Sequence, residues 1–343
     1  MAIAGRLYGP ELRHYADPAT EFQVIRLTDP VHASGMTAPH LRQFARRGNF
    51  LLHWSDRAGT RQAYTIDLKD GESRQITDAA ALDPTSLSLS NDDRNVVFFD
   101  GSALSEVALG SYRSRELYKV PGGSERVGLA VSNDGSVVFA ERAGEKSKVV
   151  VVNRLRPAAT GGFPVDGSVG LVMARPRRPQ VLYRVNDAVW LANYDGSNKK
   201  QLKLEPGQTG EMLWTGSGQS LIYLHVPDDP KQLITLREHF PEENQDKLLA
   251  KTSQFGTFSI NNDASVFAGA SRSRASAYVL ILLRVTRREL TLCEHRASDP
   301  AMVSPIFSPD SQSVFFASDR HGKSAIYRVH VEKFVENTED ENQ

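Results

Sequence analysis

The sequence contains a single cysteine, Cys293, so no disulfide bond can form within the chain. Cys293 ends the alternating run Leu290-Thr291-Leu292-Cys293, which is typical of a strand, and we expect a small buried side chain rather than a nucleophile. The sequence also lacks an excess of either charge, because Lys plus Arg and Asp plus Glu both number 41. This balance excludes a global basic field for nucleic acid or an anionic membrane, so any anionic partner must bind locally.

Long apolar runs are missing as well. The segment Met1 to Pro10 has no apolar core of the kind found in secretory signals, and no run approaches the roughly 20 residues of a membrane helix. We therefore expect a cytoplasmic protein without a membrane or nucleic-acid partner. The chain has no Gly-rich phosphate loop, paired-cysteine metal knuckle, His-Glu-x-x-His or Gly-x-Ser-x-Gly sequence, so the common catalytic motifs assign no activity.

What the sequence does contain is a repeated pattern of short strands and turns. Ser304 to Val331 has three apolar runs separated by turns at residues 308–311 and 319–322, which predicts an antiparallel meander. Similar Asp-containing turns recur at residues 90–93, 132–135 and 261–264. An Asp in such a turn accepts hydrogen bonds from its own backbone, so the repeated Asp indicates structure and not a ligand.

The spacing of this repeat predicts the fold. The equivalent turn positions are Arg47, Asp92, Asp134, Arg177, Ser217, Asp263 and Asp310, which lie 45, 42, 43, 40, 46 and 47 residues apart. Each step has the length of one four-stranded blade, and blades that close into a ring leave only short edges. We therefore predict an all-β, seven-bladed β-propeller that forms a single domain over residues 1–335. Residues 336–343 carry four acidic side chains and are expected to form a disordered tail.

Several segments between the repeats have specific predictions. The last repeat supplies only three strands, so we expect residues 21–28 to complete the final blade as its outer strand. Residues 28–41 are irregular and carry His32 and His40, which indicates a long connection on one rim of the ring. Residues 154–167, rich in Pro and Gly, are interpreted as an inter-blade loop, and residues 237–246 as a polar excursion between two strands.

The chain resembles the oligogalacturonate lyases over nearly its whole length. The resemblance is carried by the opening segment Tyr15 to Thr28, by Asp195-Gly196-Ser197-Asn198, by Gly210 to Trp214 and by Phe307 to Tyr327. The repeat motifs are shared with other propellers, such as the Tol-system periplasmic protein and peptidase propellers. The resemblance implies a propeller fold and β-elimination on short pectic uronides. In this reaction a base removes the proton α to the uronate carboxylate while a divalent metal, usually manganese, neutralises that carboxylate.

The sequence departs from this family where the metal ligands are expected. The resemblance places a His-Pro-His-Pro segment at Met302-Val303-Ser304-Pro305, so two imidazole ligands are replaced. A family glutamine falls near Asp299, one family histidine falls on Glu211, and another falls near Thr257. Glu211 and Asp299 are oxygen donors and are therefore the candidate metal ligands, although two carboxylates alone make a weak site.

The other candidates are histidines and arginines in expected loops. His295 and Arg296 are the candidate catalytic residues, because they lie with Asp299 in the connection into the last blade. His32, His40, Arg272 and Arg274 are the candidate substrate-binding residues, the two arginines because they make the sixth blade locally basic. His53 is expected to pack within a blade.

Two functions fit the sequence. One is a lyase on small acidic sugars, with a possible manganese ion. The other is a non-catalytic propeller that binds a small anionic ligand or a protein partner on its rim. The replaced histidines distinguish the two readings.

Overall fold

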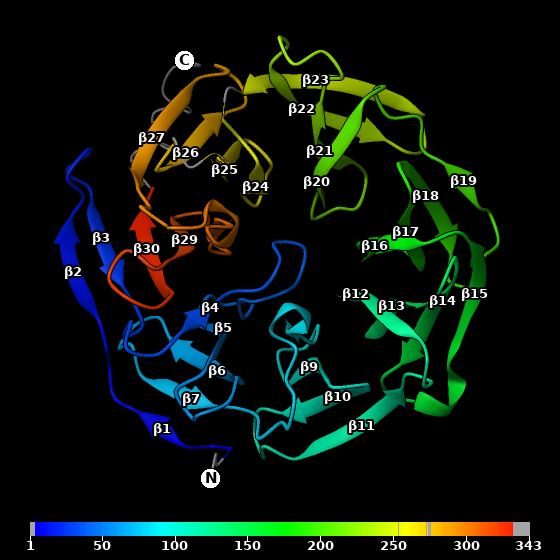
Figure 1. The fold of residues 1–343 in the computed structure, drawn as a ribbon, viewed down its shortest axis with the longest axis horizontal. Coiled ribbons are helices and arrows are strands. Elements are labelled where there is room, and N and C mark those ends of the chain that lie inside the picture. The colour runs from blue at the N-terminus through cyan, green and yellow to red at the C-terminus, as the bar shows by residue number, and fades with distance from the viewer. Residues whose placement is uncertain (1–3, 253, 272, 274–275, 332–343) are drawn as a thin grey trace.

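The strands of this chain form seven sheets that stand around a central axis like the blades of a propeller (Figure 1). The computed structural model describes residues 4–252, 254–271, 273 and 276–331. The predicted all-β, seven-bladed fold is confirmed. The expected tail at residues 336–343 lies outside the described residues.

In each blade the strands run antiparallel from the inner strand beside the channel to the outer strand. Blade 1 contains β4 (Ser34–Gly35), β5 (Phe50–Ser55), β6 (Gln62–Asp67) and β7 (Ser73–Gln75), followed by β1 (Leu7–Tyr8). Blade 2 contains β8 (Ser88–Leu89), β9 (Asn95–Asp100), β10 (Ala103–Ala108) and β11 (Ser114–Lys119). Blade 3 contains β12 (Glu125–Val131), β13 (Ser136–Ala143), β14 (Lys146–Asn153) and β15 (Gly161–Asp166). Blade 4 contains β16 (Val169–Ala174), β17 (Gln180–Val185), β18 (Ala188–Asn193) and β19 (Lys200–Gln201).

The remaining blades follow the same order. Blade 5 contains β20 (Gln208–Trp214), β21 (Leu221–Val226), β22 (Ile234–Phe240) and β23 (Gln245–Thr252). Blade 6 contains β24 (Thr257–Ile260), β25 (Val266–Ala270), β26 (Tyr278–Leu283) and β27 (Glu289–Glu294). Blade 7 contains β28 (Ile306–Phe307), β29 (Ser313–Ser318) and β30 (Ala325–His330), followed by β3 (Gln23–Arg26) and β2 (Arg13–Ala16). Three short 3-10 helices lie in connections: η1 (Pro84–Ser86), η2 (Pro157–Ala159) and η3 (Pro300–Met302).

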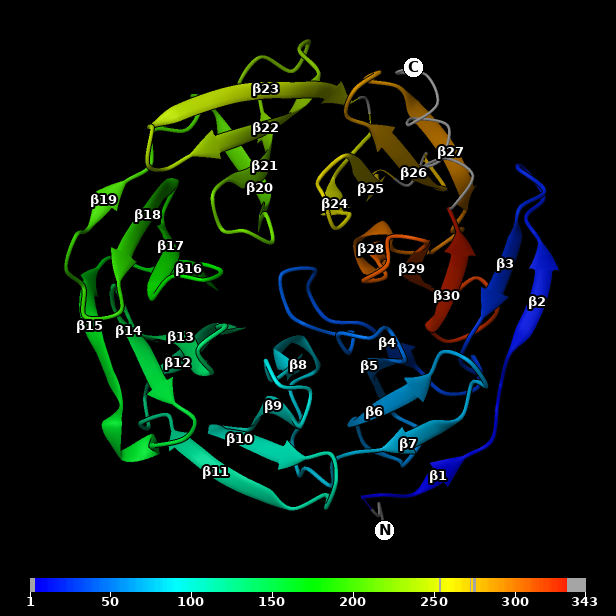
Figure 2. The same ribbon diagram turned by 180° about the vertical axis from the view of Figure 1, so that it is seen from behind.

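The N-terminal segment closes the ring, as the sequence predicted. β3 pairs with β30, with Val24 opposite Val329 and Ile25 opposite Arg328. β2 adds a further strand outside β3, so residues 21–28 are not the outermost strand of the blade. Both views of the ribbon show the blue N-terminal strands beside the red C-terminal strand (Figures 1 and 2). This pairing joins the two ends of the chain and removes an open sheet edge.

Two sequence-based segment predictions are wrong. Residues 154–167 are not only a loop, because residues 161–166 form β15, the outer strand of blade 3. Its Pro164 is tolerated because an edge strand has one side without a partner strand. Residues 237–246 are largely strand, since β22 extends to Phe240 and β23 begins at Gln245. Polar side chains fit there because they pair with each other: the Arg237 guanidinium lies 2.5 Å from the Asp246 carboxylate.

The hydrophobic core is divided among the contacts between neighbouring blades. Seven clusters of buried apolar side chains lie one at each of the seven contacts, including the contact of blade 7 with blade 1. A blade that is apolar on both faces buries them only by contacting two neighbours, which is why the blades stack radially.

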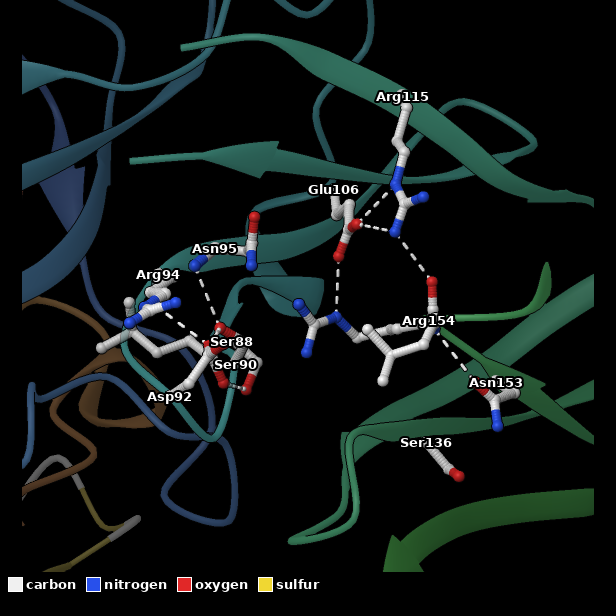
Figure 3. Close-up of polar contacts among 12 residues, drawn as sticks. Ser88, Ser90, Asp92, Arg94, Asn95, Glu106, Arg115, Ser136, Asn153 and Arg154 are labelled. Atoms are coloured by element: carbon white, nitrogen blue, oxygen red, sulfur yellow. Dashed lines mark hydrogen bonds and ion pairs between the residues drawn. The ribbon is translucent and has the colours of Figure 1, made fainter. Parts of the chain in front are cut away.

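Ion pairs with a buried carboxylate reinforce some of these contacts. At the contact of blades 2 and 3, the Glu106 carboxylate lies between Arg115 and Arg154, and its Oε2 accepts a hydrogen bond from Arg154 Nε at 2.7 Å (Figure 3). Arg115 also donates to the backbone oxygen of Arg154. A similar arrangement joins blades 5 and 6, where Glu238 accepts from Arg284 at 2.6 Å.

Candidate functional site in the central channel

Residues 36–42, which we call the plug, leave the inner strand of blade 1 and enter the central channel. Gly35 pairs with Trp54 and Phe44 pairs with Leu51, so residues 36–43 lie opposite only Leu52 and His53 and cannot all remain in the sheet. The blue segment beyond β4 reaches toward the centre of the ring in both views (Figures 1 and 2). The expectation that the whole connection 28–41 lies on one rim is therefore wrong for residues 36–41, which enter the channel.

The plug is held by a buried glutamine. Gln43, 2% exposed, accepts a hydrogen bond from the Thr37 backbone N–H at 2.8 Å through Oε1. Its Nε2 donates to the backbone oxygens of Thr37 and Ala38, both at 3.1 Å. Since all three bonds join the two ends of the plug, this side chain fixes the loop's shape.

Further bonds attach the plug to blade 2. The backbone oxygen of Arg42 accepts from Leu89, and the Arg42 side chain donates to the Ser90 backbone oxygen and pairs with Asp93. The plug is therefore a rigid support for the residues at its tip.

We call the face where the chain passes from one blade to the next the upper face. A cavity of about 370 Å³ opens there beside the plug, and we call it the charged pocket. It is lined by Ala38, His40, Leu171, Arg184, Thr209, Gly210, Glu211 and Met212. The pocket therefore brings one imidazole, one guanidinium and one carboxylate together from the plug, blade 4 and blade 5.

The two charged side chains of this pocket are positioned by backbone groups. Arg184, in β17, donates from Nη1 to the backbone oxygen of Thr209 at 3.3 Å. Glu211, in β20, accepts at Oε2 from the backbone N–H of Phe258 at 3.2 Å. A guanidinium keeps several other donors after one such bond, and its planar geometry suits a ligand carboxylate.

His40 is a neutral imidazole at neutral pH. Burial in the channel lowers the pKa of His40 to about 4, because the charged form loses its hydration there. His40 also lines a smaller cavity of about 200 Å³ deeper in the channel, whose lining residues are mostly apolar. It therefore marks the boundary between the charged pocket and the apolar interior of the channel.

The residues predicted to be catalytic lie elsewhere. His295 follows β27 and is only 1% exposed, its Nδ1 accepts from the Ala297 backbone N–H at 3.0 Å, and burial lowers the pKa of its imidazole to about 4. Arg296 is exposed and pairs with Glu294. Neither side chain lines the charged pocket.

The other predicted binding residues have separate positions. His32 lies on the upper rim, with Nδ1 4.0 Å from the Asp56 carboxylate. Arg272 and Arg274 lie outside the described residues. Of the four predicted substrate-binding residues, only His40 lines the charged pocket.

The donor set does not fit a transition metal. Asp299 is exposed and accepts from the Ala301 backbone N–H at 3.0 Å, which caps η3. Glu211 shares its cavity with one histidine and no second carboxylate. Across the part of the chain that the structure describes, no group of three or more His, Cys, Asp or Glu side chains could hold a metal ion.

A second cavity, of about 320 Å³, lies on the other side of the plug tip, and we call it the neutral pocket. It is lined by Gly35, Met36, Thr37, Ala38, Trp54, Pro84, Thr85, Ala301, Met302, Ser304, Ala317 and Ser324. Met302 and Ser304, which stand where the resemblance places histidines, thus face a cavity. Ala38 lines both pockets, so the two are adjacent.

Fold and cavities together define a closed seven-bladed propeller with a two-part pocket at the upper end of a plugged channel. No family model matches the chain. The oligogalacturonide lyase of Pectobacterium atrosepticum is 22% identical, with 94% of this chain and 97% of that protein aligned. The oligogalacturonate lyase of Dickeya dadantii is 21% identical over 92% and 95%. A solved oligogalacturonate lyase in complex with manganese matches with a TM-score of 0.90 and 21% identity, covering 96% of this chain and 98% of that one. The chain is therefore a homologue of oligogalacturonate lyases in sequence and shares their fold.

Sequence reasoning missed Arg184 as a site residue. It lies within the apolar strand Val181 to Val185, where a single charged residue gives no local signal of function. Its place in the pocket depends on the neighbouring blade, because Arg184 of β17 reaches the backbone of Thr209 in β20.

Among the described residues, no helix has the length and the apolar character required to cross a membrane.

Proposed function

We propose that this chain is an oligogalacturonate lyase-like cytoplasmic propeller that binds a short uronide in the charged pocket and acts in the breakdown of pectic fragments. The observation that supports the proposal is the meeting of Arg184, Glu211 and His40 in one cavity of about 370 Å³. This volume is within the range of small-molecule sites, roughly 300–1,000 Å³. Homology to the lyases supports the choice of a uronide as the anion.

The three side chains match the needs of β-elimination. The Arg184 guanidinium pairs with the uronate carboxylate and stabilises the negative charge that develops when the α carbon loses its proton. Glu211 or the neutral His40 accepts that proton. The electron pair forms the new carbon–carbon double bond, and the bond from the β carbon to the glycosidic oxygen breaks. That oxygen leaves with the electron pair and takes up a proton, which gives one unsaturated and one saturated product.

This route uses no metal, because the described donors do not form a manganese site. A divalent-ion site formed by Glu211, Asp299 and His295 would be weak, since Asp299 caps η3 and His295 is buried. Added manganese is expected to leave both the rate and the melting temperature unchanged.

The test is an elimination assay on di- and trigalacturonate, followed by the ultraviolet absorbance of the unsaturated uronate. Arg184→Met should abolish binding and turnover. Glu211→Gln and His40→Gln separate the two candidate bases, because the variant that loses the base should keep binding while its rate falls at least about 100-fold. Elimination that requires added manganese would contradict the metal-free route.

A second candidate is a non-catalytic propeller that binds a uronide or an acidic protein segment. The observation that favours it is the loss of nitrogen ligands at Met302 and Ser304, which line a cavity without a charged side chain. Uronide binding that depends on Arg184, with no product in the assay, would support this alternative over the lyase.

A further inference from the structure

The neutral pocket differs in chemistry from the charged pocket beside it. Among the described residues that line it, none carries a formal charge. Trp54 lines it together with Met36 and Met302. An aromatic face with flexible apolar neighbours suits the carbon-bound hydrogens of a sugar ring or a methyl group.

The indole is held in place by the backbone beneath it. A Cβ atom added at Gly35 would lie 2.7 Å from Trp54 Cζ2, so only glycine permits the ring to pack against this strand. The guanidinium of Arg61 lies 5.5 Å from the ring centroid but does not line the pocket. Trp54 is therefore a fixed wall of the pocket.

Three of the four hydroxyl groups that line this pocket are already used as donors. Thr37 donates to the Leu87 backbone oxygen at 3.2 Å, Thr85 to the Asp83 carboxylate at 2.7 Å, and Ser324 to the Ser34 backbone oxygen at 2.8 Å. Each hydroxyl keeps lone pairs, so these three offer acceptors to a ligand. A carboxylate needs a cation or several donors. Among the described lining side chains, the Ser304 hydroxyl and the Trp54 indole N–H are the remaining donors, and without a cation they compensate the desolvation of a carboxylate only in part.

We propose that the neutral pocket binds the second ring of the ligand, and that this ring is neutral: a uronate whose carboxyl is esterified, or an uncharged sugar. The inference rests on the proposed function, because it requires the first ring to have its free carboxylate at Arg184. The two pockets lie next to each other at Ala38, and the inference requires adjacent rings of one short chain to occupy them together across the plug tip. The substrate class is thus a partly esterified uronide rather than a fully acidic one.

The test compares two probes, free digalacturonate and its monomethyl ester, by titration calorimetry. The wild-type protein should bind the ester at least about tenfold more tightly, since a free carboxylate in the neutral pocket lacks a cationic partner. Met302→Arg places a cation in this pocket and should reverse the preference. Val285→Arg adds the same charge at a 68% exposed position in the turn between β26 and β27 and should leave the preference unchanged.

The outcomes separate this inference from the function on which it rests. The inference is overturned if both probes bind equally, or if the free acid binds more tightly, while binding still depends on Arg184. The proposed function stands in that case. Failure to bind either probe, or binding that survives Arg184→Met, overturns both. A Trp54→Phe variant gives a second readout, because ligand-dependent quenching of indole fluorescence should be lost while binding remains measurable.

Discussion

Three histidines of this propeller are kept neutral by burial. His40, His53 and His295 each have a pKa lowered to about 4, because the surrounding protein removes water from the imidazolium form. His53 stacks on Tyr64 with ring centroids 5.7 Å apart, and its Nε2 has no hydrogen-bond partner. The expectation that His53 packs within a blade agrees with this position.

These pKa shifts predict acid sensitivity at mild pH. Above the unfolded value of about 6.5 the imidazoles are neutral in both states and do not affect stability. Between about 6.5 and 4 the unfolded chain binds protons that the folded protein does not, so the free energy of unfolding falls as pH falls, by up to about 1.4 kcal/mol per pH unit for each histidine. Melting temperatures measured from pH 7.5 to 4.5 should show this decline.

The variant His53→Phe tests the source of the decline. An apolar ring of similar shape should fold at pH 7 and flatten the acid-side slope, because one of the three groups no longer takes up a proton in the unfolded state. A slope identical to that of the wild-type protein would mean that carboxylates, which titrate lower, account for the acid sensitivity.

Only some residues of the candidate site could be predicted from the sequence, for a physical reason. His40 and Glu211 were selected, one from an irregular segment and one from a family resemblance, and both line the charged pocket. Arg184 was missed, because a pocket formed by side chains from separate blades leaves no local pattern. His295 was selected as a loop residue, although it is 1% exposed, because burial after a strand depends on the neighbouring blade.

At the scale of elements, neighbouring blades are joined by buried charge pairs as well as by apolar contacts. The side chains of Arg154 and Glu106 are 7% and 6% exposed, so neither charge is well solvated (Figure 3). Breaking such a pair leaves one buried charge without a partner, which costs more than the pair contributes.

Glu106→Ala should therefore lower the free energy of unfolding by about 3–5 kcal/mol. The double variant Glu106→Ala/Arg154→Met should recover a large part of that loss, because the uncompensated cation is removed. Denaturant unfolding of the two single variants and the double variant gives the coupling directly. Additive losses would show that the two side chains act independently.

The plug predicts a local effect on dynamics. Gln43→Ala removes the three hydrogen bonds that join the two ends of the plug. Amide hydrogen exchange in residues 36–42 should therefore accelerate by at least about tenfold, because the plug can open locally without unfolding of the blade. Gln62→Ala is the matched control, because this buried glutamine makes similar bonds to Thr77 and Ala79 outside the plug. Equal acceleration of the plug in both variants would contradict the assigned role of Gln43.

The strands were predictable from the sequence where apolar and polar residues alternate regularly, and less so at the outer edges of the blades. β15 was missed because its glycines and Pro164 suppress the strand signal, while the edge position tolerates them. The ends of β22 and β23 were missed because their charged residues find partners in the fold: Arg237 pairs with Asp246 of the neighbouring strand, and Glu238 pairs with Arg284 of blade 6. In both cases the place of the residues in the sheet is decisive, and the local sequence does not reveal that place.

At the scale of the whole molecule, the ring depends on one junction between the chain's two ends. β30 has β29 on one side and β3 on the other, so the N-terminal segment covers the edge of β30 that would otherwise have no partner strand. Asp17, 1% exposed, strengthens the junction. Its Oδ1 accepts from the backbone N–H groups of Ala19 and Thr20, and its Oδ2 accepts from the backbone N–H of Glu294 in blade 6 at 2.9 Å.

Removal of residues 1–28 should therefore expose the edge of β30 together with Tyr327 and Val329, which are fully buried in the intact ring. An unpaired apolar edge recruits other chains, so this truncation should aggregate or melt well below the full chain. Removal of residues 1–12 is the matched control. It deletes β1 but keeps β2, β3 and Asp17, and it should remain monodisperse with a smaller loss of stability. Size-exclusion chromatography and thermal melting of both truncations distinguish the two cases, and a monodisperse, equally stable product of the longer truncation would show that the ring closes without β3.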